Sequence, residues 1–134
     1  MLIRLDPTGD TPLYVQLRNQ IVMAIGSGAL RRGESLPTVR QLAEDAGINA
    51  MTVNKAYAIL RQEGYIQIDR RHGAKVSPTA DLTGEFREKL ENELNLLIAE
   101  SGLKGVGRQE FLELCGRIFD RMGGSPNRAE EEWA

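Results

Sequence analysis

The stretch SLPTVRQLAEDAGINAMTVNKAYAILRQEGYIQIDRRHGAKV, residues 35–76, decides the fold of this 134-residue chain. Its first half predicts two short helices around a turn that contains Gly47, and its second half predicts two short strands around a basic tip. This order of elements is typical of a winged helix-turn-helix. No other part of the chain carries so dense a pattern.

Local signals mark the ends of the two helices. Pro37 forces the residue before it into extended geometry. Thr38 and Gln41 form a T-x-x-Q capping box, and Gly47 ends the first helix because glycine most easily adopts the left-handed conformation of a helix exit. Asn49 caps the second helix. The inward faces are apolar, with Val39, Leu42, Ala43 and Ala46 on the first helix and Val53, Ala56, Tyr57 and Leu60 on the second.

The flanking segments complete the module. Thr11-Pro12 offers an N-cap followed by proline at the first helical position, and an apolar stripe predicts a helix that ends near residue 26. Ser35-Leu36 predicts a short extended piece. After Gly64, residues 65–69 and 74–77 predict the strands of the hairpin, with its tip at residues 70–73. The apolar stripe of the helix that ends near residue 26 consists of Leu13, Leu17, Ile21, Ala24 and Ile25.

The charges divide unevenly along the chain. Residues 1–77 hold ten Lys/Arg and seven Asp/Glu, a net charge of +3. Residues 78–134 hold seven and twelve, a net charge of −5, and the two parts sum to the −2 of the whole chain. This asymmetry favours a first part that binds an anion and a second part that does not.

Composition excludes several classes of protein. The single Cys115 and the single His72 exclude an internal disulfide and a His/Cys zinc cluster. The sequence carries no glycine-rich phosphate loop and no paired-carboxylate motif, so we expect no enzymatic activity and no cofactor. No apolar run approaches the roughly 18–20 residues that span a bilayer, and no signal peptide is visible. We therefore expect a cytoplasmic protein without membrane association.

Outward residues at the start of the second helix are candidates for DNA contact, because recognition helices read bases near their N-terminus. Asn54 can offer an amide to a base edge, Thr52 a hydroxyl to a base or phosphate, and Lys55 a charge to a phosphate. Asn49 is a further candidate. Alternatively, Asn49 serves only as a cap and Lys55 only as a solvated charge.

Arg40 lies in the first turn of the preceding helix. Cations are disfavoured at a helix N-terminus, so an arginine there suggests that a bound anion compensates. A salt bridge to Glu44, four residues further on, explains the arginine nearly as well.

The hairpin tip combines Arg70, Arg71 and His72 with Gly73. Such a tip is suited to a minor groove or a phosphate backbone, and the glycine permits the turn or a close backbone approach. Loop tips are also charged merely for solubility. Because this hairpin tip follows a helix-turn-helix, we interpret it as a DNA-binding wing.

The C-terminal part predicts two amphipathic helices and a tail. The first stripe contains Phe86, Leu90, Leu94, Leu97 and Ile98, with Asp81 or Thr83 as candidate caps. Glycines 102, 105 and 107 predict a turn before the second stripe. We expect a winged helix-turn-helix DNA-binding domain at residues 1–77, a helical dimerisation appendage at 78–124 and a disordered tail at 125–134. The second stripe contains Phe111, Leu114, Cys115, Ile118, Phe119 and Met122.

Taken together, these residues resemble the GntR family of bacterial transcription regulators. The resemblance covers roughly residues 11–77. Its motifs are Gly28-x-Leu30-x-x-Gly33-x-x-Leu36-Pro37-Thr38-x-Arg40, then Thr52-Val53-x-x-Ala56-Tyr57 and Glu63-Gly64-Tyr65-Ile66.

The resemblance implies roles for single residues. It assigns DNA contacts to Arg40, to Thr52 and Asn54 on the recognition helix, and to the wing glycine Gly73. Ala50 departs from the family, because many relatives place arginine or another polar residue there. The operator sequence of a relative therefore does not transfer to this chain.

The short C-terminal part resembles the YtrA-type subfamily, in which a helical appendage dimerises and the regulated genes often encode transporters. Two amphipathic helices cannot bury their stripes alone, so pairing with a second copy is also the physical expectation. The alternative is that they pack on the domain of their own chain. We expect a homodimeric repressor that binds double-stranded operator DNA, with any small-molecule effector unidentified. The rival function is a winged-helix module that binds proteins.

Overall fold

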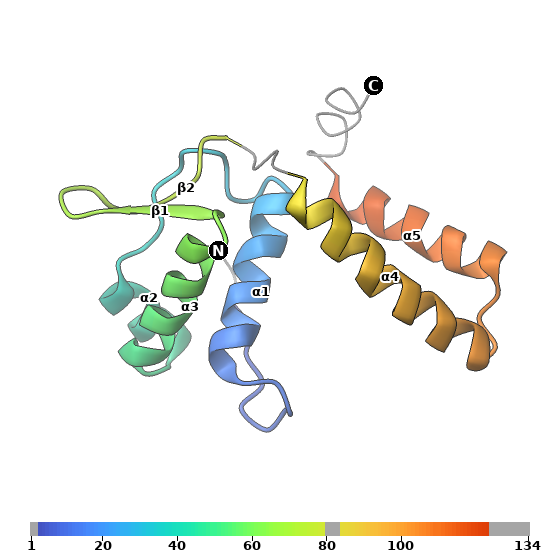
Figure 1. The fold of residues 1–134 in the computed structure, drawn as a ribbon. Helices are drawn as coiled ribbons and strands as arrows, with labels where there is room; N and C mark the ends of the chain where they lie inside the picture. The colour runs from blue at the N-terminus through green and yellow to red at the C-terminus, as the bar shows by residue number, and fades with distance from the viewer. Residues whose placement is uncertain (1–2, 80–83, 124–134) are drawn as a thin grey trace. The chain divides into compact units, whose positions relative to one another are not determined.

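The computed structural model describes residues 3–79 and 84–123, and it divides the chain into two compact units, Met1–Ala80 and Asp81–Ala134 (Figure 1). The first unit contains α1 (Leu13–Gly26), α2 (Val39–Ala46), α3 (Ala50–Gln62), β1 (Ile66–Asp69) and β2 (Gly73–Val76). The second contains α4 (Glu85–Leu103) and α5 (Arg108–Met122). The predicted mainly helical fold with a small hairpin wing is confirmed. The predicted tail, residues 125–134, lies outside the described residues.

The helix-turn-helix forms through the predicted caps. The Thr38 hydroxyl accepts a hydrogen bond from the Gln41 backbone N–H at 3.1 Å, and the Gln41 side chain accepts one from the Thr38 N–H at 3.4 Å. Gly47 ends α2 at a φ of 68°, in the left-handed region. Asn49 caps α3 by accepting the Met51 N–H at 2.8 Å. The cap predictions for α2 and α3 are therefore confirmed.

The start of α1 differs from the prediction. Pro12, and not Thr11, is the N-cap, and the helix begins at Leu13. Pro12 has an extended backbone with ψ 147°, so it lies outside the helix while its carbonyl accepts the Val15 and Gln16 N–H groups. No side chain caps this end.

Two glutamines of α1 hold the preceding segment. Gln16 exchanges hydrogen bonds with the Asp6 backbone, accepting its N–H and donating to its carbonyl, both at 2.8 Å. Gln20, one turn later, makes the same pair of contacts with Arg4. Each side-chain amide thus pairs with the N–H and carbonyl of one residue, as the backbone of a neighbouring strand would. Ile3 and Leu5 of the same segment pack against the core.

The hairpin is antiparallel, with Ile66 opposite Val76 and Asp69 opposite Gly73. The first strand is shorter than predicted because the Tyr65 N–H is used by the helix exit, where it donates to the Leu60 carbonyl. Gly73 opens β2 at a φ of 70°, so it belongs to the strand end as well as to the tip. Residues 34–36 run beside β2 and confirm the predicted extended piece.

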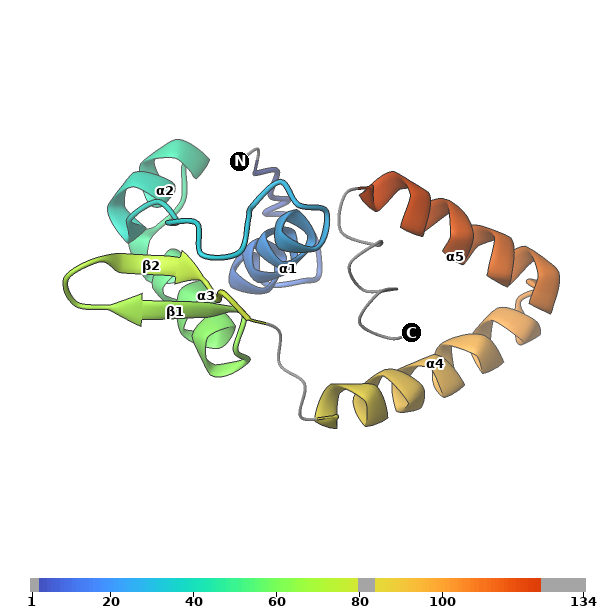
Figure 2. The same ribbon diagram turned by 90° about the horizontal axis from the view of Figure 1, so that it is seen from above.

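One core holds the first unit together. Leu17 and Ile21 of α1 and Val53, Ala56 and Leu60 of α3 are fully buried. α2 and the hairpin close the core from two other sides (Figure 2). The remaining buried apolar residues are Leu30, Leu36, Leu42, Ala43, Tyr57, Ile66, Ala74 and Val76.

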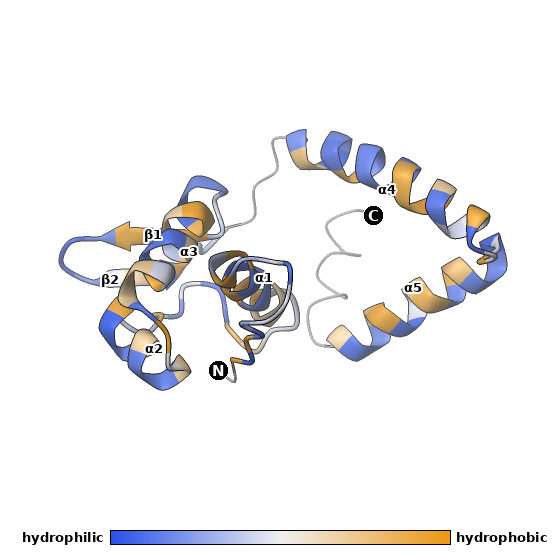
Figure 3. Cartoon of the chain, turned by 90° about the horizontal axis from the view of Figure 1, so that it is seen from below, coloured by the Kyte–Doolittle hydropathy of each residue, from blue (hydrophilic) through white to orange (hydrophobic). Residues whose placement is uncertain are grey.

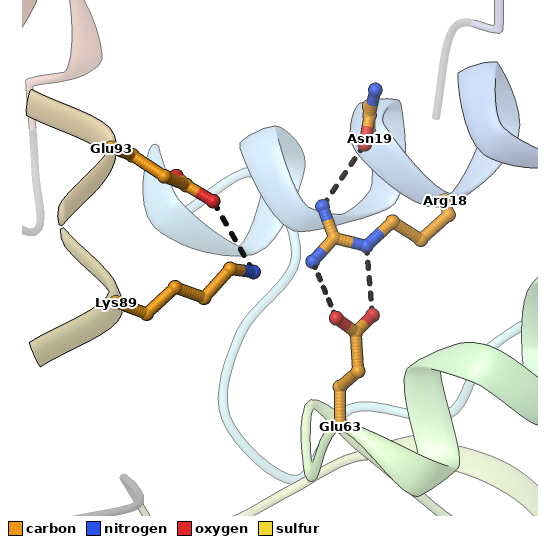
Figure 4. Close-up of polar contacts among 5 residues, drawn as sticks. All are labelled: Arg18, Asn19, Glu63, Lys89 and Glu93. Atoms are coloured by element: carbon orange, nitrogen blue, oxygen red, sulfur yellow. Dashed lines mark hydrogen bonds and ion pairs between the residues drawn. The ribbon is translucent and has the colours of Figure 1, made fainter. Parts of the chain in front are cut away.

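An ion pair ties α1 to the exit of α3 (Figure 4). The Arg18 guanidinium donates to both Glu63 carboxylate oxygens, at 2.9 and 3.0 Å, and also lies 5.4 Å from the centre of the Tyr65 ring. The hydrogen bond to the Glu63 carboxylate raises the pKa of Arg18. The Glu63-Gly64-Tyr65 motif therefore has a structural role in this chain.

The second unit leaves its apolar residues exposed or half-buried. α4 begins after Gly84 and not at a capping Asp81 or Thr83, two residues that lie outside the described residues. Neither α4 nor α5 buries a residue, and hydrophobic positions recur along both helices (Figure 3). Among the large hydrophobic side chains of these two helices, the largest exposed fractions belong to Leu103 at 87%, Leu96 at 65% and Phe119 at 64%. Lys89 and Glu93 form an ion pair along α4 at 3.8 Å.

Candidate nucleic-acid interface

The N-terminal half of α3 presents a polar and exposed outer face. Met51 is 69% exposed, and Asn54 and Lys55 are exposed as well, while Thr52 is half-buried. At 100° per residue, Met51 projects opposite the buried Val53, and Thr52 and Asn54 lie on opposite flanks of the helix. Side chains on both flanks can therefore reach separate partners.

Asn49 has two uses on this face. Its side-chain oxygen accepts the Met51 N–H, which satisfies a free donor at the start of α3. The capping role predicted for Asn49 is therefore confirmed. Its NH₂ group stays exposed beside the helix N-terminus and keeps two donors available.

Arg40 lies beside the start of α3. It lines a surface groove of about 550 Å³ along α2 and the turn that leads into α3, together with residues that include Glu44, Gly47 and Ala50. Within the described ranges, Arg40 and Glu44 form no ion pair. The salt bridge that the spacing suggested is absent there, and the exposed guanidinium is available to an external anion.

Lys55 has a partner that the sequence did not indicate. Its ammonium lies 5.3 Å from the centre of the Tyr14 ring, so α1 holds it by a cation–π contact. The charge remains exposed on the flank of α3 that is next to α1. No pattern in the sequence pairs these two residues.

An aspartate organises the tip of the hairpin. Asp69 accepts the Arg71 backbone N–H at 2.9 Å, and its other oxygen lies 2.8 Å from the His72 Nδ1. The His72 hydrogen bond, followed by that from Arg71, lowers the pKa of the Asp69 carboxyl. His72 is therefore ion-paired when protonated, whereas the side chains of Arg70 and Arg71 project without ion-pair partners among the described residues.

A second groove, of about 490 Å³, is lined by residues of α3, of the hairpin and of the start of α2. Asn54, Tyr57, Arg61 and Gly73 are among the residues that line it. The Tyr57 hydroxyl donates to the Pro37 carbonyl at 2.7 Å, and burial raises the pKa of Tyr57 to about 12. This bond links α3 to the residue before the α2 cap.

Comparison with known proteins identifies the class. Residues 13–76 match the family described as bacterial regulatory proteins, gntR family. The HTH-type transcriptional repressor YtrA of Bacillus subtilis is 33% identical over 130 residues, which cover 94% of this chain and 99% of YtrA. The chain belongs to the GntR family.

One solved structure agrees with this membership of the GntR family, and a second shares the fold. YtrA from Sulfolobus acidocaldarius, a GntR-family transcription factor, is 34% identical, covers 71% of this chain and 99% of its own, and has a TM-score of 0.59. A transcriptional antiterminator from Listeria monocytogenes is 24% identical, covers 92% of this chain and 95% of its own, and has a TM-score of 0.83. The second likeness shows that the fold extends through the C-terminal helices.

Family membership makes this chain a GntR-type, DNA-binding transcriptional regulator of the YtrA type, and its relatives are regulators and not enzymes. No group of three His, Cys, Asp or Glu side chains that could hold a metal ion occurs within residues 3–79 and 84–123. In the same ranges, no helix is long and apolar enough to cross a membrane.

Proposed function

We propose that the chain is a homodimeric repressor that binds a specific operator through its first unit. The observation that carries this proposal is the grouping of exposed or half-exposed polar and cationic side chains around the start of α3, with the exposed Arg40 beside it. A bacterial regulator of chromosomal DNA works in the cytoplasm, and we propose that location.

The contacts divide by chemistry. Thr52, Asn54 and the free amide of Asn49 face base edges in the major groove, where amide and hydroxyl groups read the donor and acceptor pattern. Arg40 and Lys55 contact phosphates, which position the helix without reading sequence. The wing, namely Arg70, Arg71, His72 and Gly73, enters the adjacent minor groove.

A second copy of the chain covers the exposed apolar residues of α4 and α5. Phe86, Leu90, Leu94 and Leu97 share one face of α4 by helical spacing, and all four are exposed or half-exposed. The net charge of −5 on residues 78–134 disfavours DNA as the occupant. Dimerisation would place two copies of α3 in successive major grooves, with half-sites roughly 34–36 Å apart.

The proposed regulation rests on a relative that matches nearly the whole chain. YtrA of Bacillus subtilis is a repressor, and we propose the same sign here, with the protein's own operon and transporter genes as targets. An effector, where one exists, would bind at the interface between two copies.

Selection from a random duplex library tests the DNA-binding part. The full chain should enrich a palindrome whose half-sites lie one helical turn apart, and Asn54→Ala should relax preference at one base pair of each half-site, by about 1–3 kcal/mol. Failure to enrich any sequence at low salt would contradict the proposal. Retention of a protein partner without duplex binding would favour the rival, a protein-interaction module.

Sedimentation velocity tests the dimer. Leu97→Glu places a charge on the apolar face of α4 and should give a monomer, because burying an unpaired carboxylate is strongly unfavourable. Asn95→Glu adds the same charge on the opposite face of α4 and should leave the dimer intact. A wild-type monomer at micromolar concentration would instead support packing of the helices on their own chain.

A further inference from the structure

The two cations of α3 lie on different flanks of the helix. Lys55 points toward α1, where its ammonium lies over the Tyr14 ring. Arg61, two turns after Asn54, shares the flank that faces the hairpin and lines the groove between α3 and the wing. Arg61 is exposed, and its side chain has no hydrogen bond or ion pair among the described residues.

The chemistry of this groove favours an anion. Arg61 is the only charged residue among those that line it, and no carboxylate does so. Asn54 adds a polar side chain, while the Tyr57 hydroxyl is already engaged with Pro37 and the Thr38 hydroxyl with Gln41. The groove beside Arg40 differs, because Glu44 also lines it and offsets the positive charge.

The geometry of DNA supplies a candidate anion. A helix in the major groove is bordered by one sugar–phosphate strand on each side, and one of those strands separates the major groove from the next minor groove. If α3 occupies the major groove and the hairpin the adjacent minor groove, that strand must pass between them. The groove lined by Asn54, Arg61 and Gly73 lies between α3 and the hairpin, and its lining also includes residues 37–39 at the start of α2.

We propose that this groove holds the sugar–phosphate strand between the two DNA grooves, and that Arg61 binds a phosphate of that strand. The proposal rests on the DNA-binding function proposed above. Arg61 would thereby position α3 from the wing side, as Lys55 does from the side of α1. It would contribute affinity without reading a base.

A structural role for Arg61 is the competing explanation. Arg61 lies in the last turn of α3, where a cation stabilises the helix by its interaction with the exposed carbonyl groups. That role affects unfolding and leaves the salt dependence of DNA binding unchanged. The two roles are therefore separable by measurement.

The test compares Arg61→Gln, Arg61→Lys and the control Arg117→Gln, a charge removed from the appendage. Duplex binding of each full-length dimer is measured by fluorescence anisotropy at four salt concentrations, and thermal unfolding is measured separately. Each phosphate contact contributes about 0.9 to the slope of log K against log salt. Arg61→Gln should thus lower the slope by about 1.8 per dimer and weaken binding at low salt about tenfold or more, with base preference unchanged. Arg61→Lys should keep the slope, and Arg117→Gln should match the wild type.

Three outcomes overturn the assignment. A wild-type slope in Arg61→Gln, with lower thermal stability, would show a structural role alone. A fall in slope in Arg117→Gln equal to that in Arg61→Gln would show a general effect of lost positive charge and no phosphate contact in this groove. Wild-type protein that binds no duplex would remove the proposed function itself, a result distinct from the first two.

Discussion

The substitution Tyr57→Phe tests how the helix-turn-helix is held together. Tyr57 lies on the inner face of α3 and is 3% exposed. Its hydroxyl donates to the Pro37 carbonyl at 2.7 Å, just before the cap of α2. Phenylalanine keeps the ring in the core and removes this one hydrogen bond, so the change isolates the link between α3 and the turn that starts α2.

The expected loss of stability is about 1 kcal/mol at neutral pH, the net contribution of a hydrogen bond whose partner loses its donor. For a unit of 60–100 residues this corresponds to a fall in Tm of roughly 4–8 °C. The overall structure should persist, because no cavity is created.

The pH dependence gives a second and sharper signature. Burial raises the pKa of Tyr57 to about 12 from its usual 10.0. Between these values the unfolded chain has already released the tyrosine proton and the folded chain has not. Stability therefore falls as pH rises through this window, by roughly 1 kcal/mol at pH 11, whereas Tyr57→Phe lacks this fall. The wild-type advantage should vanish near pH 11.

Urea unfolding followed by circular dichroism, for both proteins from pH 8 to pH 11, measures the difference directly. Taking the difference between the two proteins removes the titration of the other tyrosines and of the lysines. A constant difference across this range, or equal stability at pH 8, would refute the reasoning.

Three further changes probe other parts of the first unit. Glu63→Gln should lower stability by about 1 kcal/mol in urea unfolding, and the loss should shrink in high salt, because the contact with Arg18 is partly exposed. Gly47→Ala should cost about 1 kcal/mol in the same assay through its φ of 68° alone, since no atom crowds the added methyl group. The contact between Asp69 and His72 should order the wing above the usual carboxyl pKa of 3.8 and be lost as pH falls below it, because the pKa of Asp69 is lowered. Amide signals of residues 70–73 should follow this titration in NMR spectra, and Asp69→Asn should abolish it.

Local signals predicted the helix-turn-helix because its helix ends are formed by contacts between residues that are close together in the sequence. The capping box of Thr38 and Gln41, the exit at Gly47 and the cap at Asn49 each involve residues at most four apart, and each has the expected contact. The start of α1 was wrong by one residue because proline is tolerated both at the first helical position and just outside the helix. The start of β1 was wrong because the Tyr65 N–H serves the exit of α3.

The contacts that could not be predicted join residues far apart in the chain. The three contacts are Arg18 with Glu63, Tyr57 with Pro37, and Lys55 with Tyr14. Helix and strand periodicity does not predict contacts at such separations in the sequence. The groove that contains Arg61 is visible only once the hairpin is placed beside α3.

One missed contact of the candidate site was local. An aspartate at the end of a strand, just before a turn, commonly accepts the N–H two residues further on, which is what Asp69 does with Arg71. This pattern was sufficient to predict an ordered wing, with Asp69 as the residue that orders it.

The central claim is that the first unit binds a specific DNA duplex. The most direct measurement is an anisotropy titration of the full-length protein against the duplex enriched from the library and a scrambled duplex, each at two salt concentrations. The proposal predicts tight binding that prefers the enriched duplex and weakens steeply with salt, by several orders of magnitude for six to ten phosphate contacts between about 50 and 200 mM. Equal affinity for both duplexes, or no binding to either at low salt, would contradict it.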